Sequence, residues 1–154
     1  MKKGFTILTI FAITFFVAQT LMAATATSNL SVSANVVAKC SMQSVTDIAF
    51  GEYDVTSSSP TDAAGDMTFK CTKGTSFKTY ITGTRQMSNG TDNLTFQLYS
   101  DSGRSTVFPS DNSGSSENAS SSAPITKNIY GRIPASQDVG TGNYSTTLTA
   151  TVEY

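Results

Sequence analysis

Side chains that could carry out catalysis are scarce in this chain of 154 residues. It contains no histidine, which excludes Ser-His-Asp and Cys-His arrangements and the H-E-x-x-H zinc site. Two carboxylate pairs, Asp47 with Glu52 and Asp101 with Asp111, remain conceivable, because glycoside hydrolysis needs only two carboxyl groups. Both pairs lie in Gly- and Ser-rich stretches typical of surface loops. We therefore expect no catalytic residues and no enzymatic activity.

Ligand-binding motifs are also missing from the sequence. The stretch from Asp111 to Asn118 is the nearest to a calcium loop, but its acidic residues do not follow the required spacing. The phosphate- and dinucleotide-binding glycine patterns are absent too. Lys and Arg form no cluster, so a nucleic-acid partner is not expected. We expect no cofactor, no metal and no small-molecule substrate.

The two cysteines, Cys40 and Cys71, could form either a structural bridge or a redox pair. A redox dithiol usually shows close C-x-x-C spacing, which is absent here. In an exported chain an even number of cysteines favours pairing. We therefore predict a structural disulfide between Cys40 and Cys71, provided that the chain is exported.

The N-terminus has the layout of a secretory signal peptide. Two lysines precede an apolar run over residues 5–18, and small residues follow. The run is too short to cross a membrane. We predict a signal peptide over residues 1–23, with cleavage after Ala23, Ala24 or Ala26. Removing the two lysines leaves eight Lys and Arg against eleven Asp and Glu, a net charge of −3, in one domain.

The rest of the chain has the pattern of an all-β protein. Apolar residues recur with period two, and Ser and Thr are abundant. A β-sandwich is expected. The predicted strands are Val45–Phe50, Asp66–Thr72, Phe77–Thr82, Leu94–Tyr99, Ser105–Phe108, Ile125–Ile133 and Tyr144–Tyr154. The polar stretch Ser110–Pro124 is predicted to be a mobile, solvated loop because it has too few apolar side chains to join a core.

Two alternating segments stand out at the ends of the mature chain. The first follows the signal peptide and places Leu30, Val32, Ala34 and Val36 on one face. The second ends the chain and places Tyr144, Thr146, Leu148, Ala150, Val152 and Tyr154 on one face. No strand follows the second segment, so at a sheet edge its outer backbone groups would be unpaired.

Four stretches carry a resemblance to a known family. They are "IAFGEYD" from Ile48, "MTFKCTKGT" from Met67, "NLTFQLYSDSGRSTVF" from Asn93 and, most specific, "IYGRIPASQDVGTGNYSTTLTATVEY" from Ile129. Together they resemble the spore coat protein U domain family, which includes the subunits of archaic, Csu-type chaperone-usher pili. The resemblance runs through nearly the whole mature chain.

The resemblance implies an incomplete immunoglobulin-like β-sandwich that lacks its last strand. A periplasmic chaperone, and afterwards the N-terminal segment of a neighbouring subunit, would supply that strand. It also implies export through an outer-membrane usher to the cell surface, as a shaft or adaptor subunit for attachment and biofilm formation. Residues 24–38 would be the donor segment, with Leu30, Val32, Ala34 and Val36 inserted. Residues 39–154 would be the pilin domain, with the alternating terminal segment at the edge of the acceptor groove.

A second hypothesis remains beside this one. Residues 24–38 could instead be the domain's own first strand, paired within its chain ahead of Cys40. The protein would then be a self-contained, secreted β-sandwich that acts as a spore-coat or carbohydrate-binding protein. Arg132 could orient a carboxylate group, although a structural ion pair is the plainer interpretation.

Overall fold

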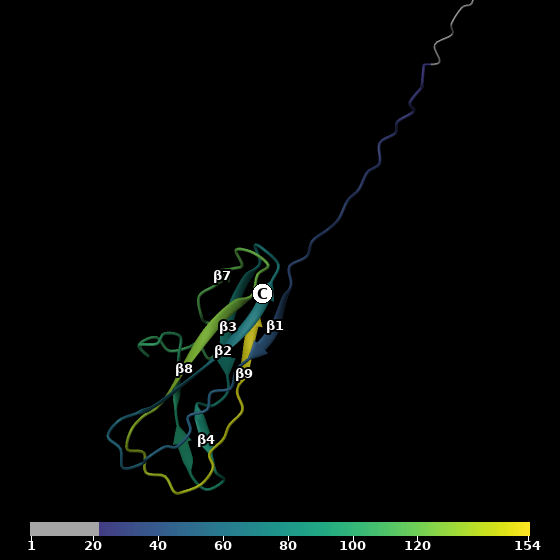
Figure 1. Ribbon diagram of the computed structural model, residues 1–154. Coiled ribbons are helices and arrows are strands. Elements are labelled where there is room, and N and C mark those ends of the chain that lie inside the picture. The colour runs from purple at the N-terminus through teal and green to yellow at the C-terminus, as the bar shows by residue number, and fades with distance from the viewer. Residues whose placement is uncertain (1–21) are drawn as a thin grey trace, which may run out of the picture. The chain divides into compact units, whose positions relative to one another are not determined.

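The structure, a computed structural model, describes residues 22–154. The predicted signal peptide lies almost wholly outside these residues. The chain divides into a part that ends at Ala34 and a compact unit from Asn35 to Tyr154. Residues 22–39 contain no helix or strand, and all the strands follow them (Figure 1). Between residues 22 and 154, no helix is long and apolar enough to span a membrane.

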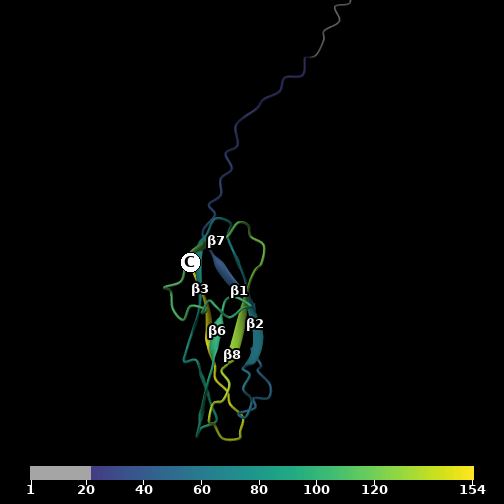
Figure 2. The same ribbon diagram turned by 90° about the vertical axis from the view of Figure 1, so that its left-hand side faces the viewer.

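The compact unit is all-β, as the sequence predicts, and its strands form two main antiparallel sheets. The first sheet has the order β1 (Cys40–Val45), β2 (Thr61–Cys71), β8 (Ile125–Ile133) and β6 (Gln97–Tyr99). The second has the order β7 (Glu117–Asn118), β3 (Ser76–Thr82) and β9 (Thr149–Glu153). A separate hairpin joins β4 (Gln86–Ser88) to β5 (Asn93–Thr95). Figure 2 shows β3 and β2 in different layers.

The core lies between the two sheets. Phe69 of β2 meets Phe77 of β3 edge to face, with ring centroids 5.1 Å apart, so the layers contact each other directly. The buried apolar side chains come from both layers and from the loops between them: Met67, Phe69, Cys71, Phe77, Ile81, Leu94, Phe96, Leu98, Phe108, Ala119, Ile129 and Ile133. The predicted sandwich is therefore present.

Two of the predicted strands match the structure closely. The prediction Ile125–Ile133 coincides with β8, and Phe77–Thr82 differs from β3 by one residue. In β8 the buried residues Ile129, Gly131 and Ile133 occupy every second position, and in β3 the buried Phe77 and Ile81 lie on the same face, which gives a period-two signal. Strand β2 is longer than predicted, because its polar first half from Thr61 pairs with β8 all the way to Ile133.

The predicted strand Val45–Phe50 is wrong. Strand β1 precedes it and ends at Val45, and the ladder is followed by a single further hydrogen bond, in which the Thr46 amide donates to the Asp66 carbonyl at 2.8 Å. Residues 46–50 then leave the edge of the sheet and lie over the inner face of β2 and β8. The apolar alternation at these positions reflects packing on a sheet rather than pairing in one.

Two glycines make this crossing possible. A Cβ atom on Gly65 of β2 would lie 2.5 Å from the Thr46 carbonyl oxygen, and one on Gly131 of β8 would lie 2.7 Å from Cζ of Phe50. Both distances are shorter than Cβ contacts allow, so the glycines let the Thr46 backbone lie close to β2 and the Phe50 ring lie close to β8.

Three further predictions need correction. The predicted strand Leu94–Tyr99 is divided at Phe96 into β5 and β6, and Phe96 donates its amide to the Arg85 carbonyl instead. The predicted strand Ser105–Phe108 forms only one isolated bridge, between Val107 and Tyr99. The predicted strand Tyr144–Tyr154 shortens to β9, because its first part pairs only through a bridge at Ser145.

The prediction that Ser110–Pro124 is a solvated loop is confirmed for most of the segment, which is exposed, but it is wrong for residues 117–119. This segment contains β7, and Ala119 is only 1% exposed. Ala119 is fixed by two backbone hydrogen bonds, to Gly74 at 2.7 Å and to Thr75 at 3.0 Å. A segment poor in apolar side chains is thus held in place by its backbone.

Candidate acceptor groove between β1 and β9

Two strand edges face each other on one side of the sandwich. Among residues 22–154, strand β1 ends the first sheet and pairs only with β2, while β9 ends the second sheet and pairs only with β3. The two strands lie side by side in Figure 1, but no ladder joins them. The outer backbone groups of both strands are therefore free to pair with an added strand.

The β1 side of this opening is apolar and incompletely covered. Met42 and Val45 face inward, because they pair with Phe69 and Met67, which are fully buried. A register shift around Gln43 places both side chains on the inner face although they are three residues apart. Yet Met42 is 37% exposed and Val45 is 50% exposed. Side chains directed at the core thus remain in contact with solvent.

The β9 side shows the same combination. Ala150 lies opposite the buried Ile81, so the even-numbered residues of β9 face inward. Leu148, Ala150 and Val152 pack against the core but are only partly buried. Tyr144 and Thr146 precede β9 and also line the opening, whereas Tyr154 lies beyond the strand and is largely exposed.

Between these sides lies a groove of about 450 Å³. Its walls are residues 45–50 and residues 144–150, and its floor reaches the buried side chains Ile81, Phe96, Leu98 and Ile129. A second hollow of about 690 Å³ continues it along residues 48–55 and 139–144. The two share Ile48, Phe50, Met87 and Tyr144, and together we call them the acceptor groove.

The groove's chemistry suits burial rather than catalysis. Its charged lining residues are the acids Asp47, Glu52 and Asp54, and no lysine or arginine lines it. Hydrogen bonds from Thr56 lower the pKa of Asp54. Desolvation, together with Asp92, raises the pKa of Tyr144, whose hydroxyl donates to the Gly140 carbonyl at 2.8 Å. These groups stabilise the loops at the rim and leave the floor apolar.

The other polar candidates serve structural roles in the described residues. Arg132 donates two hydrogen bonds, of 2.7 and 2.8 Å, to the carboxylate of Asp62. A second arginine, Arg104, contacts the same carboxylate at 3.1 Å. The carboxylates of Asp101 and Asp111 accept hydrogen bonds from nearby loop amides. No group of three or more potential metal ligands occurs among residues 22–154.

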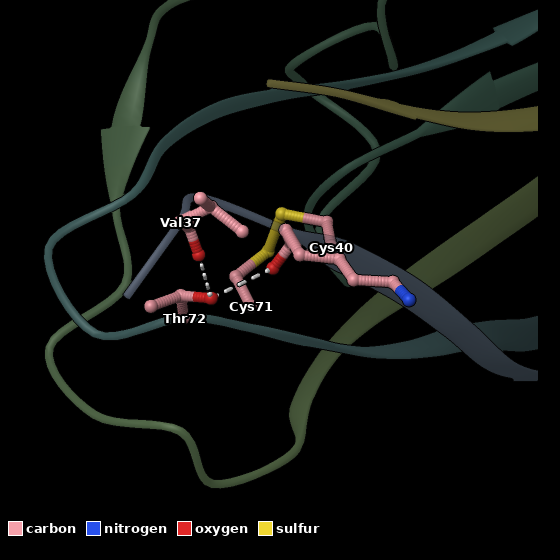
Figure 3. Close-up of a disulfide and its surroundings, with 5 residues drawn as sticks. Val37, Cys40, Cys71 and Thr72 are labelled. Carbon is pink, nitrogen blue, oxygen red and sulfur yellow. Dashed lines mark hydrogen bonds between the residues drawn. A yellow bond between two sulfur atoms is a disulfide. The ribbon is translucent and has the colours of Figure 1, made fainter. Parts of the chain in front are cut away.

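The N-terminal segment meets the compact unit at a disulfide. Cys40, the first residue of β1, is bonded to Cys71, the last residue of β2, as the sequence predicts (Figure 3). Beside it, the Thr72 amide donates to the Lys39 carbonyl at 2.8 Å, and the Thr72 hydroxyl donates to the Val37 carbonyl at 3.1 Å. The chain is therefore fixed to the domain from Val37 onward.

Ahead of this junction, the alternating segment is unpaired. Its residues Leu30, Val32 and Val36 are at least 80% exposed, and Ala34 is exposed as well. No strand is assigned in residues 22–39. The same chain thus contains an alternating apolar segment that belongs to no sheet and a groove that holds no strand.

The sequence predicts only one wall of the groove, the alternating C-terminal segment. The opposite wall, to which Val45, Ile48 and Phe50 contribute, was not predicted. The register shift at Gln43 breaks the period-two pattern there, and the sheet crossing after Val45 removes the pairing that the pattern suggests. The paired glycines at positions 65 and 131 were the available signal, because glycine inside a strand often marks a close backbone approach.

Comparisons with known proteins agree with this geometry. The family model of the Spore Coat Protein U domain matches residues 26–151. No curated protein matches the chain at a significant level. Among solved structures, the chain is similar to a chain in the crystal structure of the CsuC-CsuE chaperone-tip adhesion subunit pre-assembly complex. That complex comes from the archaic chaperone-usher Csu pili of Acinetobacter baumannii.

The structural match has a TM-score of 0.53 and 18% sequence identity. It covers 77% of this chain but only 40% of that chain, so this chain spans less than half the length of its structural neighbour. At this level of identity the likeness concerns the fold.

Proposed function

The chain belongs to the spore coat protein U domain family, and we propose that it is a structural subunit of an archaic chaperone-usher pilus. In this role it polymerises by donor-strand exchange, as a shaft or adaptor subunit, and serves attachment and biofilm formation. Its partners are neighbouring subunits, a periplasmic chaperone and an outer-membrane usher. It passes through the periplasm to the cell surface and is not an enzyme.

One observation carries this proposal. The acceptor groove opens between two strand edges that have no partner, and its floor is made of core side chains. Backbone groups along a free edge and an apolar floor below it are the two things that an added strand requires. In the proposal, the even-numbered residues Leu30 to Val36 of a neighbouring subunit face this floor.

The lengths agree with this assignment. Residues 30–36 span about 20 Å as an extended strand, at about 3.3 Å per residue. The groove walls at residues 45–50 and 144–150 are of similar length. Burial of each Leu or Val contributes about 1.5–3 kcal/mol, and each new backbone hydrogen bond contributes about 1 kcal/mol. The contact is head-to-tail, so its repetition gives a filament rather than a closed ring.

The self-contained alternative requires residues 24–38 to pair within their own chain. Residues 22–39 form no strand, and β1 begins only at Cys40. A domain that is complete by itself would also have no need of an open groove. We therefore favour the pilus subunit over a spore-coat or carbohydrate-binding sandwich.

A peptide experiment tests the proposal. The mature chain, purified with a matching periplasmic chaperone, is incubated with a synthetic peptide of residues 24–38. We expect the peptide to displace the chaperone and to raise the melting temperature. A control peptide with Val32→Ser and Val36→Ser keeps the length and charge but removes apolar contacts, so it should act weakly. A chain that is stable alone and ignores both peptides would support the self-contained alternative.

A further inference from the structure

The sandwich has a second side where edges of the two sheets meet, opposite the acceptor groove. There β6 ends the first sheet, and the outer edge of β3 is paired only over its first two residues, by β7. If they were uncovered, the backbone groups of these edges would pair with an added strand, as on the groove side. Residues 105–119 run along this side, and their contacts account for both edges.

The first part of this segment covers the edge of β6. Val107 forms a bridge with Tyr99. The Ser100 amide donates to the Thr106 carbonyl at 2.9 Å, and the Phe108 amide donates to the Leu98 carbonyl at 2.9 Å. Phe108 is 3% exposed, so its ring also fills the space between the layers here.

The second part covers the outer edge of β3. The Ile81 amide donates to the Pro109 carbonyl at 2.9 Å, and Lys78 Nζ donates to the Asn112 carbonyl at 2.8 Å. Farther along, β7 pairs with Ser76 and Phe77. One continuous segment thus passes from the edge of one sheet to the edge of the other.

Side chains hold both ends of the segment in place. At its start, the Asp101 carboxylate accepts hydrogen bonds from the amides of Ser105 and Thr106, at 3.1 and 2.6 Å. Near its end, Glu117 forms an ion pair of 2.6 Å with Lys127 of β8.

We propose that residues 105–119 are an edge seal, which prevents strand addition on this side and leaves the groove between β1 and β9 as the subunit's single acceptor site. The inference rests on the proposed function, because a subunit with two acceptor sides would branch or aggregate laterally instead of growing in single file. The composition of the segment suits this role, since it supplies backbone partners to the edges and, apart from the half-exposed Val107, presents polar or small side chains to solvent.

Two variants open the seal without changing the groove. The first, Asp101→Ala with Glu117→Ala, removes both side-chain anchors. The second replaces residues 110–116 by a Gly-Ser linker of equal length, which removes the hydrogen bond from the Asn112 side chain to Glu153 and frees the backbone of this stretch. Asp111→Ala is the matched control, because its carboxylate accepts a hydrogen bond only from Ser113 within the segment itself. Hydrogen exchange at the Ile81 amide reports whether the edge of β3 has opened.

Assembly is then followed by electron microscopy and sedimentation. We expect single filaments from the parent chain and from Asp111→Ala, but lateral bundles or branches from both opened variants. Exchange at the Ile81 amide should be at least about tenfold faster in the opened variants, since a lost hydrogen bond of about 1.4 kcal/mol corresponds to that factor. Single filaments from both opened variants would overturn the proposal.

A staple provides the reverse test. The hydroxyl oxygens of Ser76 and Ser116 lie 2.7 Å apart, so Ser76→Cys with Ser116→Cys can tie the segment to β3. Added to the anchor variant, it should restore single filaments, and alone it should leave assembly unchanged. A staple that blocks assembly would overturn the proposal, because the segment would then have to move for strand exchange.

The result also separates this inference from the proposed function. If the parent chain forms no filament and binds no N-terminal peptide, the proposed function fails. The edge seal is then tested by measuring, in sedimentation, whether the unassembled domain associates. Concentration-dependent association of the opened variants, with a monomeric parent, supports it, and monomeric opened variants refute it.

Discussion

An aspartate at position 32 tests whether the even-numbered face of the N-terminal segment enters the groove. Val32 is 86% exposed in the free chain, so Val32→Asp should leave the stability of the domain unchanged. In the assembled contact the same change removes about 1.5–3 kcal/mol of burial and places a carboxylate over an apolar floor, at a further cost of several kcal/mol. A total loss above about 3 kcal/mol weakens binding at least about 100-fold.

The assay uses three labelled peptides of residues 24–38 and fluorescence anisotropy on the same preparation of the mature chain. The matched control is Ser33→Asp, which adds the same charge one residue along, where the side chain faces away from the floor. It should weaken binding less than about threefold. Equal losses for both peptides would refute the alternating insertion of this segment, and so would a Val32→Asp peptide that binds like the parent.

Three further changes test the domain itself. Cys71→Ser opens the disulfide loop, whose ends are 31 residues apart in the sequence, and should lower the free energy of unfolding by about 3.5–4 kcal/mol. Urea titration measures this loss, and an unchanged midpoint would contradict the prediction. Gly131→Ala puts a methyl group 2.7 Å from Phe50. It should destabilise the domain by about 1–3 kcal/mol and weaken peptide binding. Unaltered binding would show that residues 46–50 do not shape the groove. Asp62→Asn removes a carboxylate whose pKa is lowered mainly by the hydrogen bond from Arg132. The lowered folded-state pKa stabilises the domain above the unfolded pKa of about 3.9, and this stabilisation is lost as pH falls through the folded-state pKa. The melting temperatures of variant and parent should therefore differ at pH 7 and approach each other as pH falls below about 3.9; a constant difference would contradict this.

The sequence predicted best those strands whose partners lie within the sheet. The buried residues of β3 (Phe77 and Ile81) and of β8 (Ile129, Gly131 and Ile133) lie on one face of each strand, and the apolar pattern of the sequence indicates that face. The alternating C-terminal segment was found for the same reason, although only Thr149–Glu153 forms a strand. Pairing with β3 stops at Thr149, and nothing in the side-chain pattern of residues 144–148 marks that point.

The failures have a common physical cause, since they occur where the backbone decides the structure. Residues 46–50 keep an apolar alternation but pack over two glycines instead of pairing. Residues 110–119 look solvated, yet their amides and carbonyls complete the edge of β3 and the turn at Gly74. Hydrogen bonds between backbone groups leave no trace in residue type, so a composition argument misses both segments.

The open groove also changes what the stability of this domain means. Several core-facing side chains stay in contact with water, namely Met42, Val45 and the inner residues of β9. The isolated domain therefore buries less apolar surface than it would with an added strand. A strand that binds only the folded state adds about 2.7 kcal/mol at a concentration of 100 times its dissociation constant, and more at higher concentrations. The measured melting temperature should therefore rise with peptide concentration and keep rising after the groove is saturated. When peptide concentration is divided by the dissociation constant, the stabilisation should follow one common curve for all peptides. A melting temperature that stops rising once the groove is filled would mean that the added strand binds the unfolded chain as well, and the groove would not be a selective acceptor.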